Sequence, residues 1–520
     1  MKATKKIVSL LLAAATLLSL AACGKTNNDP VKSGGSQTTS VSTSGETVKE
    51  RLIIADSDTL TQTDPQTNNS IYNRRVYEMT HDTLVNYNPT TGETYAGLAK
   101  SWDVSDDNLE YTFHLNEGVK FHNGDDCTAE DVVYTFERAR NSSVLESTIA
   151  NLEKVEAVDP NTVKMTMSKA NVEWLITLSM NALVILDKDA IDADPDKGTM
   201  VGTGPYVFTE WMPGDYVLVT RNEDYFGELP KSKEIMYKRV PEASARVIAL
   251  QTGEVDVCLE VPAIEATHVS DANGCQLVQL PSTKIMYAGL NVSGVNKDVL
   301  DVRVRQAFNY ATDPETLILA MTEGYGQPAH GTIPPNVWGY YEGVKAYTYD
   351  VEKAKQLLAE AGHPDGIDIT LTYKASNSAG LFEVLQDMWG KAGIRLTLST
   401  DDSTVASEQL RANTYEIYAS QQSMTALGEF LMEFWYSTSS ANRTKTAEPE
   451  LDAMIEEVQT ISDPTERKAK FAEISQYLTD YAAMIPFYVD TLLIGVRDNV
   501  DGLALYGTGR HEFTYAYATE

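Results

Sequence analysis

Hydrophobic and polar positions follow two periods along this chain, and each period predicts a type of element. Short apolar or alternating runs predict strands, and apolar residues every three or four positions predict helices. The predicted strands are 51–55, 109–115, 154–158, 162–167, 255–257, 367–373, 394–398 and 485–489. The predicted helices are 71–85, 128–140, 245–250, 351–361, 381–392 and 465–481. Helices and strands alternate in the second half, which predicts an α/β fold with substantial parallel sheet.

Polar residues at the ends of these runs predict turns, caps and one ligand-contact region. Asn123-Gly124 is a strong turn signal, and Thr128 is a suitable N-cap for the helix that follows it. Asp350 caps the 351–361 helix. The first strand ends in the polar loop Ser57-Asp58-Thr59 before a helix. Such loops are common places for ligand contacts in α/β proteins.

The N-terminus has the pattern of an export signal. Three lysines precede an apolar run at 7–20, and the small residues Ala21 and Ala22 precede Cys23. The run is shorter than the ~20 apolar residues that span a bilayer. Leu20-Ala21-Ala22-Cys23 resembles the bacterial lipobox, which implies that 1–22 is removed and that Cys23 carries acyl chains such as palmitate. The alternative is an ordinary secretory signal that happens to carry a cysteine.

The segment that follows has the composition of a tether. Gly, Ser and Thr dominate it, and it contains almost no apolar residues to bury. Residues 23–49 are therefore predicted to be a lipid-anchored flexible linker with a root-mean-square reach of roughly 25–30 Å. The folded body is expected to begin at Glu50.

Length and charge restrict the class of protein. A body of about 470 residues is too long for one core and predicts two or three domains. The formal net charge is −32, and loss of the three signal lysines brings it to −35. A surface this acidic repels nucleic acid, so we expect no nucleic-acid partner.

No motif in the chain indicates an enzyme or a cofactor. The seven histidines are scattered without metal-ligand spacing, and no nucleophile elbow, phosphate loop or metalloprotease motif occurs. We therefore expect no catalytic residues, no metal and no cofactor. Besides Cys23 there are three cysteines, Cys127, Cys258 and Cys275, so at least one is unpaired within the chain. A Cys258–Cys275 bridge is one open alternative.

Several segments together resemble one known family. The largest is 97–139, GLAKSWDVSDDNLEYTFHLNEGVKFHNGDDCTAEDVVYTFERA. Further matches are GTGPYVF at 202–208, RNEDYFG at 221–227, TGEVDV at 252–257, DVRVRQAFNYATD at 301–313, YDVEKAKQLLAEAG at 349–362 and ISDPTERKAKFAEISQYL at 461–478. The chain resembles the extracellular solute-binding proteins of family 5 over roughly 50–505, which include the dipeptide-, oligopeptide- and nickel-binding components of ABC importers.

The resemblance implies a type II periplasmic-binding-protein fold, with two lobes that close on a cleft and an inserted third domain. Domain I would comprise 50–85, 201–288 and 487–520. Domain II, the insertion, would be 86–200, and domain III would be 289–486. The crossovers near 288 and 487 would form the hinge.

The implied function is a non-enzymatic, monomeric, substrate-binding lipoprotein of an ABC importer. It would capture peptides or a related small solute and deliver it to permease subunits in the membrane. Its place would be the extracytoplasmic face of the cell membrane, at the cell surface or in the periplasm. The alternatives are a lipid-anchored peptide-signal receptor, a nickel-chelate-binding protein and an extracellular hydrolase.

The resemblance also implies where the ligand binds. Ser57, Asp58 and Thr59 would line the cleft from one side, and Lys374, Ser376 and Asn377 from the other. A third segment is 420–423, Ser420, Gln421, Gln422 and Ser423. Peptide-binding members have Gly-Trp and then an Asp in that segment, and the Asp pairs with the peptide's α-amino group. This chain lacks the Trp and the Asp, which leaves peptide specificity open.

The missing aspartate allows several interpretations. Glu429 or Glu433 could bind the amine instead. The ligand could lack an amine and accept neutral hydrogen bonds from Gln421 and Gln422, or a peptide could be bound mainly through its backbone. Gln421 and Gln422 could equally form an exposed loop with no ligand role.

Aromatic residues are the other expected cleft material. Tyr287, Trp338 and Trp435 are candidates near the cleft rim, together with Tyr436. Each could instead be an ordinary core residue. Lys374 could pair with a ligand carboxylate or be a solvated surface lysine.

Overall fold

The computed structural model describes residues 47–68, 70–374, 379–401, 408–410 and 412–520. The predicted signal, the predicted lipidation site Cys23 and the loop residues Ser376 and Asn377 lie outside these ranges. Among the described residues, no helix combines the length and the apolarity needed to cross a bilayer.

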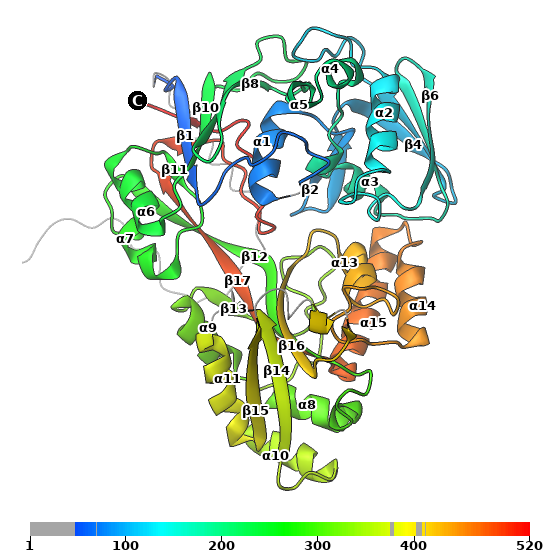
Figure 1. Ribbon diagram of the computed structural model, residues 1–520, viewed down its shortest axis with the longest axis vertical. Helices are drawn as coiled ribbons and strands as arrows, with labels where there is room; N and C mark the ends of the chain where they lie inside the picture. The colour runs from blue at the N-terminus through cyan, green and yellow to red at the C-terminus, as the bar shows by residue number, and fades with distance from the viewer. Residues whose placement is uncertain (1–46, 69, 375–378, 402–407, 411) are drawn as a thin grey trace, which may run out of the picture. The chain divides into compact units, whose positions relative to one another are not determined.

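Strands and helices are arranged around one large mixed sheet (Figure 1). The strands are β1 Arg51–Asp56, β2 Val85–Asn88, β3 Glu93–Ala96, β4 Ala99–Val104, β5 Glu110–Leu115, β6 Leu152–Asp159, β7 Thr162–Met167, β8 Tyr206–Met212, β9 Tyr216–Arg221, β10 Glu234–Arg239, β11 Val257–Cys258, β12 Cys275–Leu290, β13 Gly326–Pro328, β14 Ile367–Lys374, β15 Ile394–Asp401, β16 Ile417–Ser423, β17 Met484–Arg497, β18 Val500–Asp501 and β19 Tyr517–Ala518. The α-helices are α1 Ile71–Thr80, α2 Ala129–Ala139, α3 Trp174–Leu178, α4 Lys188–Ala193, α5 Pro195–Gly198, α6 Ala243–Thr252, α7 Ala266–Ser270, α8 Val302–Tyr310, α9 Pro314–Thr322, α10 Val351–Glu360, α11 Ala379–Lys391, α13 Leu427–Phe434, α14 Pro449–Val458 and α15 Pro464–Tyr481.

The large sheet is mixed rather than largely parallel. Its order is β15-β14-β16-β12-β17-β11-β1-β10-β9-β8, and β13 pairs with β17 off this path. β1 runs parallel to β10 and β11, and β14 runs parallel to β15 and β16. The other pairs in the sheet are antiparallel. The predicted α/β class is confirmed, and parallel pairing is confined to these two groups of strands.

Two long antiparallel strands, β12 and β17, connect the two parallel groups. β17 pairs with β11 next to β1, and β12 pairs with β16 next to β14. β12 and β17 pair with each other along most of their length, and Figure 1 shows them crossing the middle of the sheet together. Their register shifts between Pro281 and Ile285. The crossovers that the sequence placed near 288 and 487 lie in these strands.

A separate antiparallel sheet, β4-β5-β7-β6, packs against α2. The strands predicted at 154–158 and 162–167 are present as β6 and β7, which pair with each other in an antiparallel hairpin. The helix predicted after Thr128 is α2, and the Thr128 backbone N–H donates to the Asp131 carboxylate at 2.9 Å. This contact is one half of a capping box.

Helix α1 ends five residues earlier than the sequence predicted. It stops at Thr80, because Val85–Asn88 forms strand β2 and pairs with β3. Apolar spacing at 71–85 therefore continued past the helix into a strand.

Cys127, Cys258 and Cys275 are buried free thiols, so a Cys258–Cys275 disulfide is not formed.

Candidate functional site

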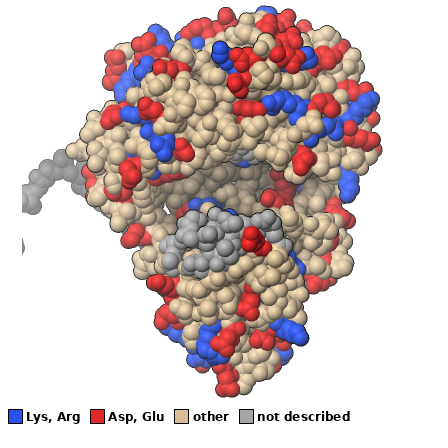
Figure 2. Space-filling view, in the orientation of Figure 1, with Lys and Arg blue, Asp and Glu red and all other residues tan. Residues whose placement is uncertain are grey.

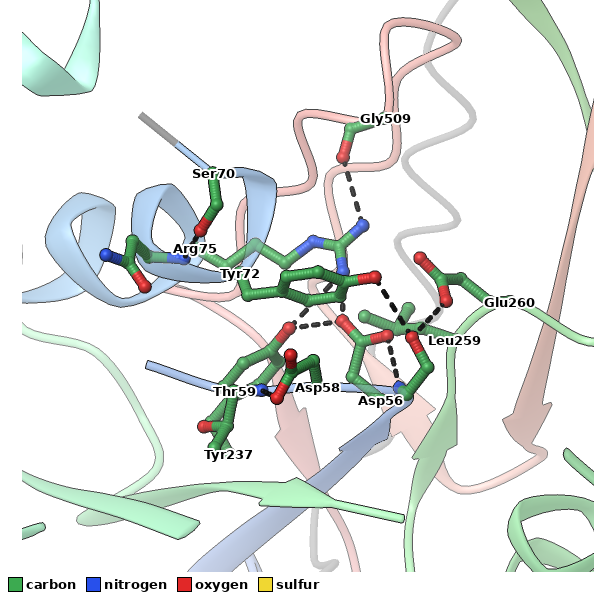
Figure 3. Close-up of polar contacts among 12 residues, drawn as sticks. Asp56, Asp58, Thr59, Ser70, Tyr72, Arg75, Tyr237, Leu259, Glu260 and Gly509 are labelled. Carbon is green, nitrogen blue, oxygen red and sulfur yellow. Dashed lines mark hydrogen bonds and ion pairs between the residues drawn. The ribbon is translucent and has the colours of Figure 1, made fainter. Parts of the chain in front are cut away.

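Three parallel neighbours, β1, β10 and β11, end at the same edge of the sheet. Ser57 follows β1, Arg239 ends β10, and Glu260 follows β11 by two residues. The carboxyl edge of parallel strands is where α/β proteins place ligands. We call Asp56, Ser57, Asp58, Arg75, Arg239 and Glu260 the charged cluster; Figure 3 shows its core.

A buried ion pair holds the first strand of the charged cluster in place. The Asp56 side chain is fully buried and contacts the Arg75 guanidinium of α1 and the Tyr237 hydroxyl of β10. The Ser57 backbone N–H donates to Asp56 Oδ1 at 2.7 Å. Arg75 also donates to the Gly509 carbonyl at 3.3 Å, which ties α1 to the C-terminal tail. Asp56 and Arg75 therefore have structural partners and leave no free charge for a ligand.

The loop after β1 is fixed by contacts from both neighbouring strands. Ser57 Oγ donates to Glu260 Oε2 at 2.5 Å and lies 3.0 Å from the Tyr72 hydroxyl. Asp58 Oδ1 accepts from Arg239 Nε at 3.0 Å and from the Thr59 backbone N–H at 2.9 Å. The charge of Asp58 is thus balanced by Arg239. Within the described chain, Glu260 forms no ion pair.

Glu260 also has an unusual backbone. Its φ is 54°, in the left-handed region that favours glycine. Such conformations cost of order 1–3 kcal/mol in a non-glycine residue and cluster at functional sites. Glu260 is therefore both the strained residue of the charged cluster and the carboxylate in that cluster without an ion-pair partner among the described residues.

A second predicted segment, Ser420 to Ser423, contains only neutral side chains, and we call it the neutral segment. It ends β16, where Ser420 lies opposite Tyr287 and Gln422 lies opposite Ile285. Successive side chains of a strand point to opposite faces, so Gln421 and Gln422 cannot face the same ligand. Gln421 is exposed and Gln422 is half-buried. Tyr287 is buried, and that burial raises the pKa of its hydroxyl to about 12.

The two candidate tryptophans pack against protein groups. Trp435 is buried in the core formed with α14 and α15. Trp338 is half-buried, with its ring 6.1 Å from that of Phe471 and 4.5 Å from the Arg467 guanidinium. Gly92 lies so close to Trp338 that a Cβ there would come within 2.5 Å of the indole. Both indoles thus have a packing role.

Glu429, a candidate for an amine contact, takes part in a contact between α3 and α13. Thr177 Oγ1 donates to Glu429 Oε1 at 2.6 Å. The buried Glu173 carboxylate accepts from the backbone N–H groups of Gly428 at 3.1 Å and Glu429 at 2.8 Å, so it caps α13. Burial and the charge of Glu173 raise the pKa of Glu429 to about 7.

The remaining candidate residues lie at the end of β14 or in the loop after it, and in the loop after β1. Lys374 is exposed at the end of β14, and Ser376 and Asn377 lie outside the described residues. Thr59 is fully buried, and its Oγ1 has no hydrogen-bond partner among the described residues. Nowhere in the described ranges do three His, Cys, Asp or Glu side chains form a group that could hold a metal ion.

Sequence reasoning missed Tyr72, Arg75, Arg239 and Glu260. They come from α1, from β10 and from the loop after β11, and they reach Ser57 or the aspartates only after folding. Glu260 had one detectable signal, because it follows a predicted strand, as Ser57 does.

Figure 2 shows the surface hollowed between the part that carries β1 and α1 and the part that carries β14 and β15.

Comparison with known proteins decides the family. Residues 93–443 match the model of the bacterial extracellular solute-binding proteins, family 5. The chain belongs to this family. Its members bind solutes outside the cytoplasm and are not enzymes.

Individual relatives are distant but nearly full-length. The chain is 27% identical to the dipeptide-binding protein of Escherichia coli over 83% of this chain and 88% of that protein. It is 28% identical to heme-binding protein A of Haemophilus influenzae over 79% and 81% of the two chains. A solved structure of HbpA2 from Haemophilus parasuis superposes with a TM-score of 0.83 at 24% identity, covering 90% of this chain and all of that one. The match at that identity establishes the fold.

Proposed function

We propose that this protein is the substrate-binding lipoprotein of an ABC importer. It captures a peptide or a related small solute at the carboxyl edge that carries the charged cluster, and it delivers that solute to membrane permease subunits. The observation that carries the proposal is the convergence of Ser57, Arg239 and Glu260 at one carboxyl edge of the sheet, in a chain of this family.

Closure of two lobes is the proposed mechanism of capture. Domain I comprises 50–85, 201–288 and 487–520, domain II comprises 86–200, and domain III comprises 289–486. The paired strands β12 and β17 act as the hinge. Their register shift between Pro281 and Ile285 supports this role, because an interrupted ladder bends more easily than a continuous one.

Ligand recognition is proposed to be divided between a charged and a neutral group of residues. Glu260 binds the ligand's ammonium group, since it is the strained carboxylate without a cationic partner in the charged cluster. The neutral segment contributes hydrogen bonds, and Lys374 binds a carboxylate. The other proposed ligand contacts are Ser57, Asp58, Thr59, Tyr287, Trp338, Ser376, Asn377, Glu429 and Trp435.

Membrane attachment is proposed to occur through acyl chains on Cys23, after removal of 1–22. The sequence pattern around Leu20–Cys23 supports this step. Intact-mass measurement of protein extracted from membranes tests it. A mature mass that starts at Cys23 with added acyl groups is expected, and a soluble chain without added lipid contradicts it.

Native mass spectrometry of gently purified protein tests the proposed function. A peptide-binding site predicts a heterogeneous set of co-purified peptides, with affinities near micromolar, or ~8 kcal/mol. Glu260→Gln should reduce the amount retained, and Glu383→Gln, at an exposed position on α11, serves as the matched control. A single small non-peptide mass would reject the peptide assignment, and a hydrolysed product would reject the binding-protein assignment.

A further inference from the structure

A cavity lies beside α1 and the C-terminal tail. Its volume is about 460 Å³, within the ~300–1,000 Å³ that small-molecule sites occupy. The end of α1, the strands β2 and β3, the loop after β9 and the C-terminal tail contribute most of its lining. No residue of the charged cluster is among its lining residues. It is therefore a separate site from the proposed transport site.

Carboxyl groups outnumber cations among the residues that line this cavity. Glu78, Asp82 and Glu512 supply three carboxyls, and Arg510 supplies the single guanidinium. Arg510 Nε donates to Glu78 Oε1 at 2.5 Å, so that pair is matched. Asp82 accepts from Thr203 Oγ1 at 2.8 Å and from the Tyr225 hydroxyl at 3.1 Å. Neither Asp82 nor Glu512 has an ion-pair partner within the described chain.

Two buried polar atoms of the lining have no partner. The Glu78 side chain is 7% exposed, and its Oε2 makes no hydrogen bond with a described residue. His81 is 2% exposed, and its Nε2 is likewise unpaired within the described residues. An unpaired buried polar group costs ~1–3 kcal/mol. Both atoms are covered by neighbouring protein atoms, so an occupant that draws either side chain toward the cavity would relieve this cost.

The other polar side chains around the cavity are hydroxyls, the amides of Asn86, Asn116 and Asn181, and a neutral imidazole. Tyr95, Tyr225 and Tyr515 line it and present aromatic faces or hydroxyls. Burial and the nearby His122 lower the pKa of His81 to about 3, so its ring is neutral. Burial likewise lowers the pKa of His122. Arg74 acts on Arg510 and Glu78 from α1 but does not line the cavity.

We propose that this cavity binds a small organic cation that carries an ammonium or guanidinium group. Asp82 and Glu512 neutralise its charge, the side chains of Glu78 and His81 turn toward it to accept hydrogen bonds, and tyrosine rings enclose it. A metal ion fits less well, because no three metal-ligating side chains of the described residues come together.

Proton linkage distinguishes this binding from adventitious association. Burial raises the pKa of Asp82 to about 6, and burial with the charge of Glu78 raises that of Glu512 to about 7. A bound cation favours the ionised carboxylates and lowers both pKa values. Binding must therefore release protons near neutral pH, and affinity must rise as pH increases from 6 to 8.

Calorimetric titration of the mature protein with 1,4-diaminobutane, butylammonium and the uncharged 1-butanol tests the proposal. The two amines should bind at least tenfold more tightly than 1-butanol, and more tightly at pH 8 than at pH 6. Glu512→Gln and Asp82→Asn should each weaken the amines at least tenfold. The matched control Glu228→Gln is exposed and does not line the cavity, and it should leave binding unchanged.

The same titration of Glu260→Gln separates this cavity from the transport site. Retention of amine binding by Glu260→Gln, with loss in Glu512→Gln, is the expected pattern whatever the transported ligand proves to be. Circular dichroism and thermal unfolding confirm that each variant is folded. The proposal is overturned if no amine binds at millimolar concentration, if amines and 1-butanol bind alike, or if folded Glu512→Gln and Asp82→Asn bind as the wild type does.

Discussion

The charged cluster and the neutral segment differ in how their polar groups are satisfied. In the charged cluster Asp56 is paired with Arg75 and Asp58 with Arg239, while Glu260 lacks an ion-pair partner among the described residues. The neutral segment at Ser420–Ser423 carries hydroxyls and amides, and alternation along β16 divides them between two faces. Most charges in the first region therefore serve the fold, and the second region offers hydrogen bonds without charge.

This difference separates two tasks that a binding site must perform. Buried ion pairs fix the backbone of a loop, because removing either partner leaves an uncompensated charge. Exposed amides adapt to different ligands at low cost. The comparison predicts that breaking a paired charge of the charged cluster mainly affects stability. It also predicts that changes at Glu260 or Gln421 mainly affect binding.

The largest expected effect follows from breaking the Asp56–Arg75 pair. Arg75→Met leaves the Asp56 carboxylate buried without a cation and should lower the free energy of unfolding by about 3–5 kcal/mol. Urea denaturation measures the change. Arg395→Met removes an exposed pair with Asp368 and should leave the free energy of unfolding nearly unchanged, because solvent screens such a pair. Equal losses in the two variants would contradict a structural role for the buried pair.

The next effect is the pH dependence of the contact between α3 and α13. Glu429 has a folded pKa of about 7 against an ordinary value of 4.5, so the fold binds its proton more tightly. Stability contributed by this proton is present below pH 4.5 and is lost as pH rises through 7, a change of up to about 3 kcal/mol. Glu429→Gln should remove that loss, so its advantage over the wild type grows between pH 5 and pH 8.

Chemical denaturation of wild type and Glu429→Gln at several pH values checks this prediction. The difference between the two proteins is the useful quantity, because Asp82 and Glu512 also have raised pKa values and contribute in the same direction. Glu383→Gln is the control and should run parallel to the wild type. A difference that is constant with pH would remove Glu429 as the titrating group.

A smaller effect is expected at Glu260 and appears in binding rather than stability. Glu260→Gln should weaken ligands with a free ammonium group about tenfold, because a charge-assisted hydrogen bond contributes about 1.5–3 kcal/mol. The same ligands with an acetylated amine should bind both proteins alike. Titration calorimetry with each ligand pair gives the result, and equal weakening of both forms would exclude Glu260 as the amine contact.

The smallest effect is expected in the neutral segment. Gln421→Ala should weaken binding about threefold to tenfold, as loss of one neutral hydrogen bond does. Free and acetylated ligands should be affected equally, and unfolding should be unchanged. Gln422→Ala is the internal control, since its side chain points to the opposite face of β16. Equal effects of both changes would show that the alternation does not govern recognition.

Periodicity along the sequence predicted helices and strands well where a clear break in the apolar pattern separates one element from the next. Helix 351–361 with its Asp350 cap and strand 367–373 were placed within a residue or two. It failed at 71–85, because the apolar spacing of α1 runs on into β2. Strand direction depends on pairing between distant segments, so the antiparallel share of the large sheet was not foreseeable from local pattern.

The site was partly predictable, because a local sequence pattern reveals only those residues that directly follow a strand. Ser57 and Asp58 follow a strand directly, which a local pattern reveals. Their partners Glu260 and Arg239 lie about 180 to 200 positions away along the chain, and they meet only because β10 and β11 flank β1. The cavity lined by Asp82 and Glu512 likewise joins segments separated by most of the chain.

The central claim is that two lobes close on a solute about β12 and β17 without chemical change in that solute. Small-angle X-ray scattering of ligand-stripped protein, before and after addition of its co-purified solute, tests this claim most directly. We predict a smaller radius of gyration on saturation and recovery of the solute unaltered. Superimposable curves at saturation, or a chemically altered solute, would contradict the claim.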